Sequence, residues 1–342
     1  MTKPPSTTVD LVRQYGGPVS HAALDPSRSL FRTPAVDGLI NYLPVWRCAV
    51  VQGDPVCAPE HKTRLADAFA DYCAGKGWSI LYVAATADLQ AHARGRGFAS
   101  MEFASLLIAD PRDDPEAGPR ARHLRQHLNH ARRTGLTVCE YQGESDAQLE
   151  ARVWTMCEAW LNDRYGPQMY LGRPRLFDDR VGRRWFIAER AGKAAGFLSM
   201  QQIGYAECRH LINLVFSAPD APLYTNELMI VTALRALRAE GIASVCLGIG
   251  PLEALGRVEG CPAHTEWLSR KLYRLFAIKL MHQHGKTVFW EKFRITRREP
   301  YTCCSNRPVS DSGHFTPCPG PLIFRERINL RHADSVLTGP QH

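Results

Sequence analysis

The chain has 342 residues, enough for one large domain or two of medium size. It contains 45% apolar and 22% charged residues, no stretch near the roughly 18 apolar residues of a membrane-spanning helix, and no apolar core at its N-terminus, so the sequence excludes a disordered or integral membrane protein and argues against secretion. The formal net charge of +8 permits contact with nucleic acid or anionic lipid but requires neither.

Strands and helices are predicted to alternate in the first half of the chain. Apolar alternation predicts two strands between Gly38 and Val51, and Gly53-Asp54-Pro55 forms the turn that ends them. Helical spacing of Leu65, Phe69 and Cys73 then predicts an amphipathic helix. The remaining predicted elements of this half are a strand at Ser79–Ala85, a helix at Ala87–Arg94, a strand at Met101–Ile108, an acidic connector at Asp110–Pro119, a helix at Arg120–Arg133 and a strand at Leu136–Tyr141.

The second half repeats the same kinds of element. They are a helix at Leu149–Leu161, strands at Trp185–Glu189, Ala195–Met200 and Leu211–Ser217, a helix at Glu227–Ala239, a strand at Ser244–Leu252, a helix at Lys271–His284 and a final strand at Lys286–Arg294. From Tyr301 on, Pro, Ser and Cys dominate, which is typical of a tail. The order predicts one α/β plan used twice, with too few residues for a third copy.

The eleven cysteines do not have the spacing of metal ligands, because no Cys-x-x-Cys pair occurs. Several of them lie in apolar runs, as reduced core cysteines do. We therefore expect no metal site, no disulfide framework and a cytoplasmic protein.

The segment HLRQHLNHARRTG has the sharpest local pattern. At about 100° per residue, one face of the predicted helix carries Arg122, Arg125, Asn129, Arg132 and Arg133. The opposite face carries Leu124, Leu128 and Ala131, and a third stripe carries His123, His127 and His130. Planar guanidinium groups hold phosphate oxygens bidentately, so the first face indicates binding of a phosphate backbone, with a solvated basic face as the alternative. We interpret the histidines as surface residues or helpers in anion binding.

Two further segments carry candidate site residues. Glu227 lies in the first turn of a predicted helix that Thr225 could cap, where the helix dipole stabilises an acid by about 0.3–1 kcal/mol. The alternative is that Glu227 and Asn213, on neighbouring elements, line one pocket. The run from Gly248 to Pro251 follows a strand but lacks the Lys-Ser/Thr of a phosphate loop, so it is either a tight turn or a loop that brings backbone close to a ligand.

The segment HGKTVFWEKF places lysines among aromatic residues. In the predicted strand, Lys286, Val288, Trp290 and Lys292 share one face. A half-buried lysine there could hold a phosphate or a developing oxyanion, and a lysine lying along a strand edge is the alternative. No nucleophile elbow, zinc-protease motif or kinase motif occurs in the sequence, so nothing indicates covalent catalysis.

Together these segments resemble the C-terminal domain of the phosphatidylglycerol lysyltransferase family, which also occurs in fungal sterol aminoacyltransferases. The resemblance runs from about Gly38 to Tyr301. Its pieces are Gly53-Asp54-Pro55, the Arg125-Asn129-Arg132-Gly135 helix, Tyr170-Leu171-Gly172 with Phe177-Asp178, Pro219–Pro222 followed by Glu227, Leu247-Gly248 with Pro251-Leu252, and Phe289 with Glu291-Lys292-Phe293. Asn213-Leu214-Val215-Phe216 replaces the family's Asp-Leu-Met-Arg run, and the coenzyme A signature of GNAT proteins is missing, which argues against acetyl-CoA as donor.

The resemblance implies an α/β fold of tandem GNAT-like lobes, each a mixed β-sheet flanked by helices. The expected parts are an N-terminal extension (1–37), a first lobe (38–145), a second, catalytic lobe (146–300) and a C-terminal tail (301–342). The implied activity moves an amino acid from aminoacyl-tRNA, as co-substrate, to the hydroxyl of a membrane lipid. A sterol such as ergosterol is favoured over phosphatidylglycerol as this lipid, because the Asp-Leu-Met-Arg run of the bacterial lysyltransferases is replaced. No cofactor is implied. The two substrates would meet in a channel between the lobes.

The resemblance also implies roles for particular residues. Lys292 would lie near the phosphate or oxyanion, Glu227 would bind the α-ammonium or act as base, and Asn213 would orient the substrate. Further substrate contacts are expected from Asp178, Gly248, Pro251, Phe289 and Lys286, and contacts with tRNA from Arg122, Arg125, Asn129, Arg132 and Arg133. Two other functions stay open: an acyl-CoA-dependent N-acyltransferase, and a non-catalytic tandem lobe that binds tRNA or a membrane. Peripheral contact with a membrane surface is expected.

Overall fold

The computed structural model describes residues 6–142, 146–163, 174, 176–177, 180–205, 208–280 and 288–306, without the side chains of residues 251 and 276–280. The helices of this part are α1 (Thr8–Tyr15), α2 (Lys62–Gly75), α3 (Ala87–Gly95), α4 (Arg122–Arg133), α5 (Ala147–Asn162), α6 (Thr225–Ala239) and α7 (Ala263–Leu280). The strands are β1 (Ser29–Thr33), β2 (Val36–Val45), β3 (Cys48–Gln52), β4 (Val56–Cys57), β5 (Ser79–Ala85), β6 (Ala99–Ala109), β7 (Thr137–Tyr141), β8 (Arg183–Arg190), β9 (Lys193–Gln202), β10 (His210–Ser217), β11 (Val245–Pro251), β12 (Val258–Glu259) and β13 (Ile295–Ser305).

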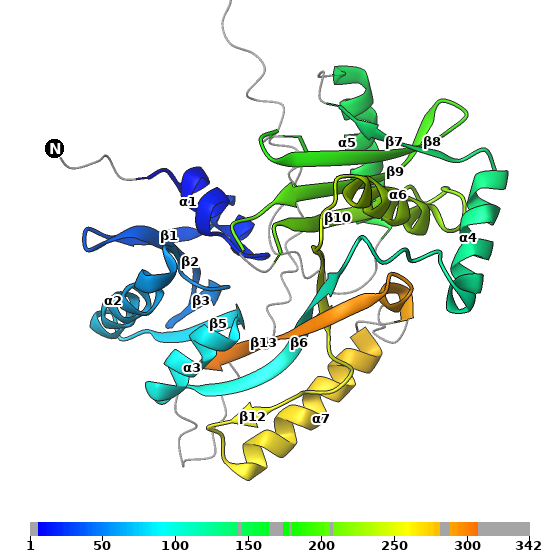
Figure 1. The fold of residues 1–342 in the computed structure, drawn as a ribbon. Coiled ribbons are helices and arrows are strands. Elements are labelled where there is room, and N and C mark those ends of the chain that lie inside the picture. Colours follow the sequence, from blue (N-terminus) through cyan, green and yellow to red (C-terminus); the bar gives the residue numbers. More distant parts are fainter. Residues whose placement is uncertain are drawn as a thin grey trace, which may run out of the picture.

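Within the described residues, one mixed sheet runs through both halves of the chain. Its order is β1-β2-β3-β5-β13-β6-β11-β10-β9-β8-β7, with β12 beside β6 and β4 beside β2. The two halves are joined because β6 pairs with β11 over Val245–Pro251 and with β13 along its whole length. The expected α/β fold with a mixed sheet flanked by helices is confirmed, but the sheet is continuous instead of separate in each lobe (Figure 1).

Helices cover both faces of this sheet, and each helix buries its apolar stripe. In the first half, α2 packs Leu65 and Phe69 on one face, while α1 packs Leu11 and Val12 on the other. In the second half, α6 and the apolar side of α4 form one core with β8, β9 and β10, and α5 forms another on the opposite face. The first of these cores includes Leu228 and Met229, so it holds the N-terminal part of α6 against the sheet. No described helix has the length and apolarity needed to cross a bilayer.

The segment expected as an N-terminal extension contributes to the sheet. β1 pairs antiparallel with β2, and α1 begins with a capping box in which Thr7 and Asp10 satisfy each other's backbone N–H groups. Leu11 and Val12 are fully buried. The expected boundary at residue 38 therefore falls within β2, which pairs with β1.

The end of the chain differs from the sequence-based expectation. The strand predicted at Lys286–Arg294 is wrong for its described part, because residues 288–291 are helical. The physical reason is that Phe289 and Phe293 have the helical i, i+4 spacing, which brings their ring centroids within 5.4 Å. The last strand is β13, and Tyr301 is buried within it, so the tail expected from residue 301 begins inside the sheet.

Candidate functional site

The N-terminus of α6 carries the central candidate, Glu227. Its carboxylate lies in the first turn of the helix, where the partial positive charge of the free N–H groups stabilises it. The N-cap is Tyr224, whose backbone is left-handed with φ +70°, and it makes no side-chain cap. The predicted capping role of Thr225 is wrong, because Thr225 lies inside the helix and its hydroxyl donates to the Pro222 carbonyl at 2.6 Å. Glu227 is only 6% exposed.

Lys292 supplies the charge partner that a buried carboxylate requires. Its Nζ donates to Oε1 of Glu227 at 3.0 Å and lies 5.2 Å from the ring centroid of Phe289. The short helical turn at residues 288–291 packs its aromatic side chains against the core that contains α6. This packing places Lys292 next to the N-terminus of α6. The structure therefore brings together two of the three residues predicted to be catalytic.

His127 is a third member of this cluster, and the sequence analysis did not assign it to the site. Its ring stacks on Tyr224 with centroids 3.9 Å apart and planes at 5°, and its Nδ1 lies 3.9 Å from Oε1 of Glu227. Burial, and then the charge of Lys292, hold the pKa of His127 below its ordinary value. The side chain of His127 is 25% exposed but its Nδ1 is buried, so the interpretation as a surface residue holds only in part, and the role as a helper in anion binding stays a prediction. The signal in the sequence was its position between the apolar and basic faces of the helix.

Asn213 and Gly248 lie where two parallel strands separate. β10 and β11 pair only at Leu211 and Cys246, although both strands continue beyond this point. Asn213 is the extra residue of a β-bulge between Ile212 and Leu214, and its side chain is exposed. Gly248 has φ +111°, and a Cβ there would stand 3.9 Å from the Ile212 carbonyl oxygen.

Bulges of this kind redirect side chains and often border functional sites. Pro251 ends β11, opposite Ala104 of β6, on the far side of this separation. Elements α6 and β10, which carry Glu227 and Asn213, contact each other, and a shared pocket for these two residues stays a prediction. Two of the predicted substrate contacts, Asp178 and Lys286, lie outside the described residues, as does Tyr170-Leu171-Gly172.

Helix α4 shows the two faces predicted from its sequence. Leu124, Leu128 and Ala131 are buried against α6 and β8, which confirms the apolar face. The exposed residues of the basic face are Arg122, Asn129, Arg132 and Arg133. Because His127 reaches the Glu227 cluster from the same helix, this basic face is carried by an element that contacts the candidate site.

Part of the basic face is occupied by the acidic connector that precedes α4. Arg125 donates to the carbonyl oxygens of Glu116 and Gly118 at 2.6 and 2.7 Å, and Arg132 lies 3.6 Å from the Glu116 carboxylate. Arg235 of α6 also pairs with Glu116. Arg125 therefore fixes the connector, while Arg122 and Arg133 point into solvent.

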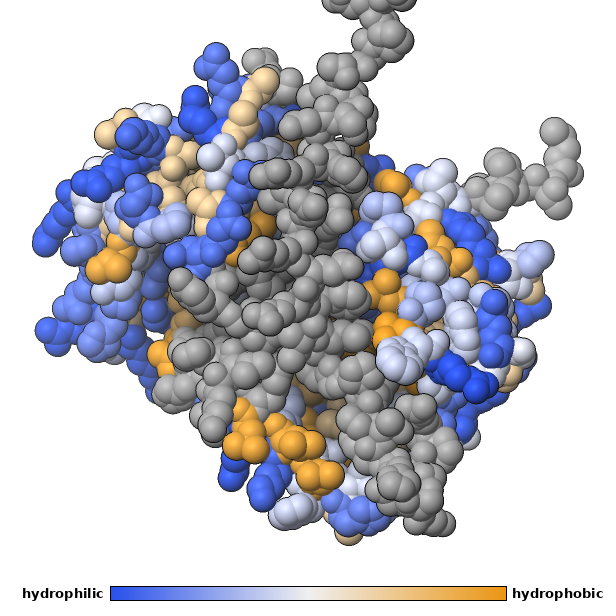
Figure 2. All heavy atoms as spheres, turned by 180° about the vertical axis from the view of Figure 1, so that it is seen from behind, coloured by the Kyte–Doolittle hydropathy of each residue, from blue (hydrophilic) through white to orange (hydrophobic). Residues whose placement is uncertain are grey.

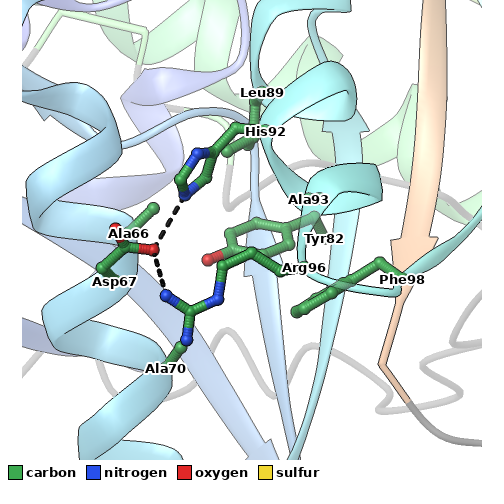
Figure 3. Close-up of a pocket in the computed structure, with 9 residues that line it drawn as sticks. All are labelled: Ala66, Asp67, Ala70, Tyr82, Leu89, His92, Ala93, Arg96 and Phe98. Carbon is green, nitrogen blue, oxygen red and sulfur yellow. Dashed lines mark hydrogen bonds and ion pairs between the residues drawn. The ribbon is translucent and has the colours of Figure 1, made fainter.

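A small cavity of about 10 Å³ lies elsewhere, between α2, α3 and β5 (Figure 3). On its wall, Asp67 contacts His92 at 2.9 Å and Arg96 at 2.7 Å. The space holds about one water molecule, so it is not a substrate site. Among the described residues no group of three or more His, Cys, Asp or Glu side chains is arranged to hold a metal ion.

The cluster at α6 can hold a polar substrate between opposite charges. A free helix N-terminus binds phosphate well, because its N–H groups and dipole favour an anion. Here the first turn of the helix already carries a carboxylate, that of Glu227, which is paired with Lys292. The arrangement favours a ligand with both a cationic group for Glu227 and an electron-rich oxygen for Lys292 over a purely anionic ligand.

Known proteins share this fold. The structure superposes on the C-terminal domain of a putative lysylphosphatidylglycerol synthetase from Agrobacterium fabrum with a TM-score of 0.72 and 18% identity, covering 88% of this chain and 91% of the other. It superposes on L-PGS from Bacillus licheniformis with a TM-score of 0.73 and 17% identity, covering 89% and 92%. These two likenesses establish the fold.

Sequence relatives point to the same group of proteins. The lysylphosphatidylglycerol biosynthesis bifunctional protein LysX of Mycolicibacterium vanbaalenii is 27% identical over 243 residues, which are 69% of this chain and 22% of that protein. LysX of Mycolicibacterium gilvum is 25% identical over 319 residues, 84% of this chain and 28% of that protein. The chain thus spans about a quarter of the length of these relatives. The family model "Phosphatidylglycerol lysyltransferase, C-terminal" matches residues 9–283, and the chain therefore belongs to this family of transferases.

Proposed function

We propose that the chain transfers an aminoacyl group from aminoacyl-tRNA to a hydroxyl of a membrane lipid, with phosphatidylglycerol as the acceptor. Family membership supports aminoacyl transfer to a lipid, and the names of the LysX relatives support this acceptor. The observation that carries the proposal is the buried pair of Glu227 and Lys292, next to the helix that bears the exposed arginines.

The reaction exchanges one ester for another. The lipid oxygen forms a bond to the ester carbonyl carbon, the bond from that carbon to the tRNA 3′ oxygen breaks, and the proton of the lipid hydroxyl passes to the departing 3′ oxygen. No oxidant, reductant or covalent enzyme intermediate is needed. The protein contributes by holding both substrates and by stabilising the charge that develops on the carbonyl oxygen.

Each residue of the cluster has a role that fits its position. Lys292 supplies a cation for the developing oxyanion, because its side chain is partly exposed while its Nζ is bonded to Glu227. Glu227 attracts the free α-ammonium of the aminoacyl group, whose charge is opposite to its own. Asn213, exposed on the bulge of β10, orients the substrate, and Gly248, beside open space, lets its backbone come close to the substrate. Arg122 and Arg133 contact tRNA phosphates.

The two rival functions have their own consequences. An acyl-CoA-dependent transferase must bind an anionic pyrophosphate, and the carboxylate of Glu227 at the α6 N-terminus opposes an anion there. A non-catalytic module would bind tRNA or membrane and form no product. A sterol would react by the same ester exchange through its own hydroxyl group. An experiment with both lipids is therefore needed to tell the two acceptors apart.

The test incubates the purified chain with a set of labelled aminoacyl-tRNAs and with vesicles that contain phosphatidylglycerol, ergosterol or neither. We expect an aminoacylated phosphatidylglycerol, detected by mass spectrometry. Product on ergosterol alone would move the acceptor to sterols. Tight binding of acetyl-CoA by calorimetry, with no lipid product from any aminoacyl-tRNA, would replace the proposal with the acyl-CoA function.

A further inference from the structure

Helix α7 exposes an apolar stripe that the proposed chemistry does not use. The exposed fractions are 62% for Trp267, 37% for Leu268, 51% for Leu272 and 48% for Leu275. Leu268, Leu272 and Leu275 follow the i, i+4, i+7 spacing, so they lie on one side of the helix. Figure 2 shows apolar side chains gathered next to hydrophilic ones at the lower edge of the molecule, where α7 lies.

Polar anchors hold the opposite side of α7 on the sheet. The hydroxyl of Tyr273 lies 2.7 Å from the Phe103 carbonyl oxygen of β6 and 2.8 Å from that of Leu252. Arg270 donates to the carbonyl oxygens of Leu255 and Gly256 at 2.7 and 3.0 Å. Because these contacts fix the rotation of the helix, the side that carries Trp267 and the three leucines faces away from the sheet.

The charges of α7 surround this stripe with a positive edge. The helix contains four Lys and Arg residues and a single acid, Glu266. Glu266 accepts from Arg270 at 2.9 Å on the anchored side. On the outward side, Lys271 and Arg274 are exposed, and Nζ of Lys271 stands 5.0 Å from the ring centroid of Trp267. No acidic residue lies on the outward side.

We propose that this outward face of α7 is the surface by which the protein lies on an anionic phospholipid membrane. An amphipathic helix with leucine and tryptophan on one face and cations at its edge has the chemistry of an interfacial helix. Leucine side chains enter the acyl boundary, tryptophan prefers the headgroup level, and lysine and arginine contact anionic headgroups. The long stems of Lys271 and Arg274 let their charges reach those headgroups while the leucines are buried.

The position of α7 suits a lipid acceptor. Only residues 281–287 separate its end from Val288, which is itself 48% exposed and is followed closely by Lys292. Figure 1 shows α7 running beside β6, which Tyr273 contacts, with its C-terminal end toward the start of β13. A membrane bound by α7 would thus present lipid close to the segment that carries Lys292. This inference rests on the proposed function in that a membrane lipid is the acceptor.

The test measures binding of the full chain to vesicles by flotation. Vesicles contain phosphatidylglycerol in phosphatidylcholine, or phosphatidylcholine alone. We expect the wild-type chain to prefer the anionic vesicles, Leu272→Gln/Leu275→Gln to weaken the binding at least about tenfold, and Lys271→Gln/Arg274→Gln to weaken it about fivefold per charge at low salt. Glutamine keeps helix propensity, so α7 stays folded. Leu30→Gln/Trp46→Gln, which changes exposed apolar residues of the other half, is the matched control and should bind as wild type.

Other occupants of the face give different results. If Leu272→Gln/Leu275→Gln binds anionic vesicles as wild type does, the proposal is wrong. If the same variant, in the absence of lipid, converts a dimer to a monomer without loss of vesicle binding, the face belongs to a second copy. If it lowers thermal stability without loss of vesicle binding, another part of this chain covers the face, and the proposal is again overturned.

A soluble acceptor separates this inference from the proposed function. With short-chain phosphatidylglycerol below its micelle concentration, Leu272→Gln/Leu275→Gln should keep wild-type transfer, while transfer to vesicles falls with the loss of binding. Absence of transfer by the wild-type chain to either acceptor would refute the proposed function alone, because vesicle binding is measured without tRNA. Equal loss on both acceptors would show that α7 supports the site and does not dock the membrane.

Discussion

Nζ of Lys292 lies 3.0 Å from Oε1 of Glu227, although 65 residues separate the two in the chain. One partner comes from the first turn of α6 and the other from the turn that precedes β13. The side chain of Glu227 is almost fully buried and that of Lys292 is partly exposed. An ion pair of this kind fixes two elements and keeps a cation at the surface of the site.

Removing the charge of Lys292 should lower the stability of the protein more than removing the charge of Glu227. Lys292→Met leaves a buried carboxylate without its main partner, so we expect a loss of about 1–3 kcal/mol in the free energy of unfolding. Glu227→Gln should cost less, because the amide oxygen still accepts from Lys292. The double variant should be more stable than the sum of the single losses predicts, as measured by urea denaturation in a double-mutant cycle. Additive losses would show that the two side chains do not interact in solution.

The pH dependence of stability should reveal His127. The pKa of His127 in the folded chain lies below the ordinary value. Below about pH 6.5 this histidine is therefore protonated more in the unfolded chain than in the folded chain. The contribution of this residue to the free energy of unfolding is therefore fully present above about pH 6.5 and is lost as the pH falls below that value. We expect His127→Phe, which keeps a flat ring against Tyr224, to lessen the fall in unfolding free energy between about pH 6.5 and 5. His123→Phe, on the exposed side of α4, is the control, and an unchanged slope for His127→Phe would contradict the assignment.

Gly248 should tolerate no side chain without strain. The space beside it is open, since the nearest atom to an added Cβ is 3.9 Å away, but its φ of +111° is a conformation that other residues rarely adopt. We expect Gly248→Ala to destabilise the protein by about 1–3 kcal/mol in thermal or urea unfolding. Gly95→Ala, at an ordinary φ in α3 with no atom within 4 Å, should be neutral or stabilising.

The exposed arginines of α4 should strengthen tRNA binding, and they should make this binding depend on the salt concentration. Arg122→Gln/Arg133→Gln removes two exposed cations, and we expect weaker binding and a smaller dependence of affinity on salt, by roughly 0.7–0.9 in the logarithmic slope per lost contact. Filter binding from low to moderate salt measures this slope. Lys193→Gln, in the exposed turn between β8 and β9, is the control. Equal slopes for the α4 variant and wild type would remove α4 from the tRNA surface.

The sequence predicted the parts of this structure that local periodicity determines. In α4, the spacing of Leu124, Leu128 and Ala131 was sufficient to predict the buried face, because an amphipathic helix buries its apolar side. The contact between Glu227 and Lys292 depends on sheet topology, which no local pattern contains. The contact of His127 also could not be predicted from a local pattern, because its stacking partner Tyr224 caps α6, a helix far from α4 in the sequence.

β13 was missed because its sequence argues against a strand. Ile295–Ser305 contains two adjacent arginines and Pro300, which lacks the N–H of a central strand. β6 borders β13 over its whole length, whereas β5 pairs only with residues from Thr302 on. Pro300 therefore lies where a strand borders only one side of β13, which a sheet tolerates. Pairing with two neighbours outweighed the local propensity.

The role of Lys292 and Glu227 in transfer is measured by single-turnover reaction of labelled aminoacyl-tRNA with phosphatidylglycerol vesicles, using wild type, Lys292→Met and Glu227→Gln. We predict aminoacylated phosphatidylglycerol from the wild-type chain, and a rate at least about a hundredfold lower for Lys292→Met, with tRNA binding unchanged. Lipid product formed at the wild-type rate by both variants would contradict the account.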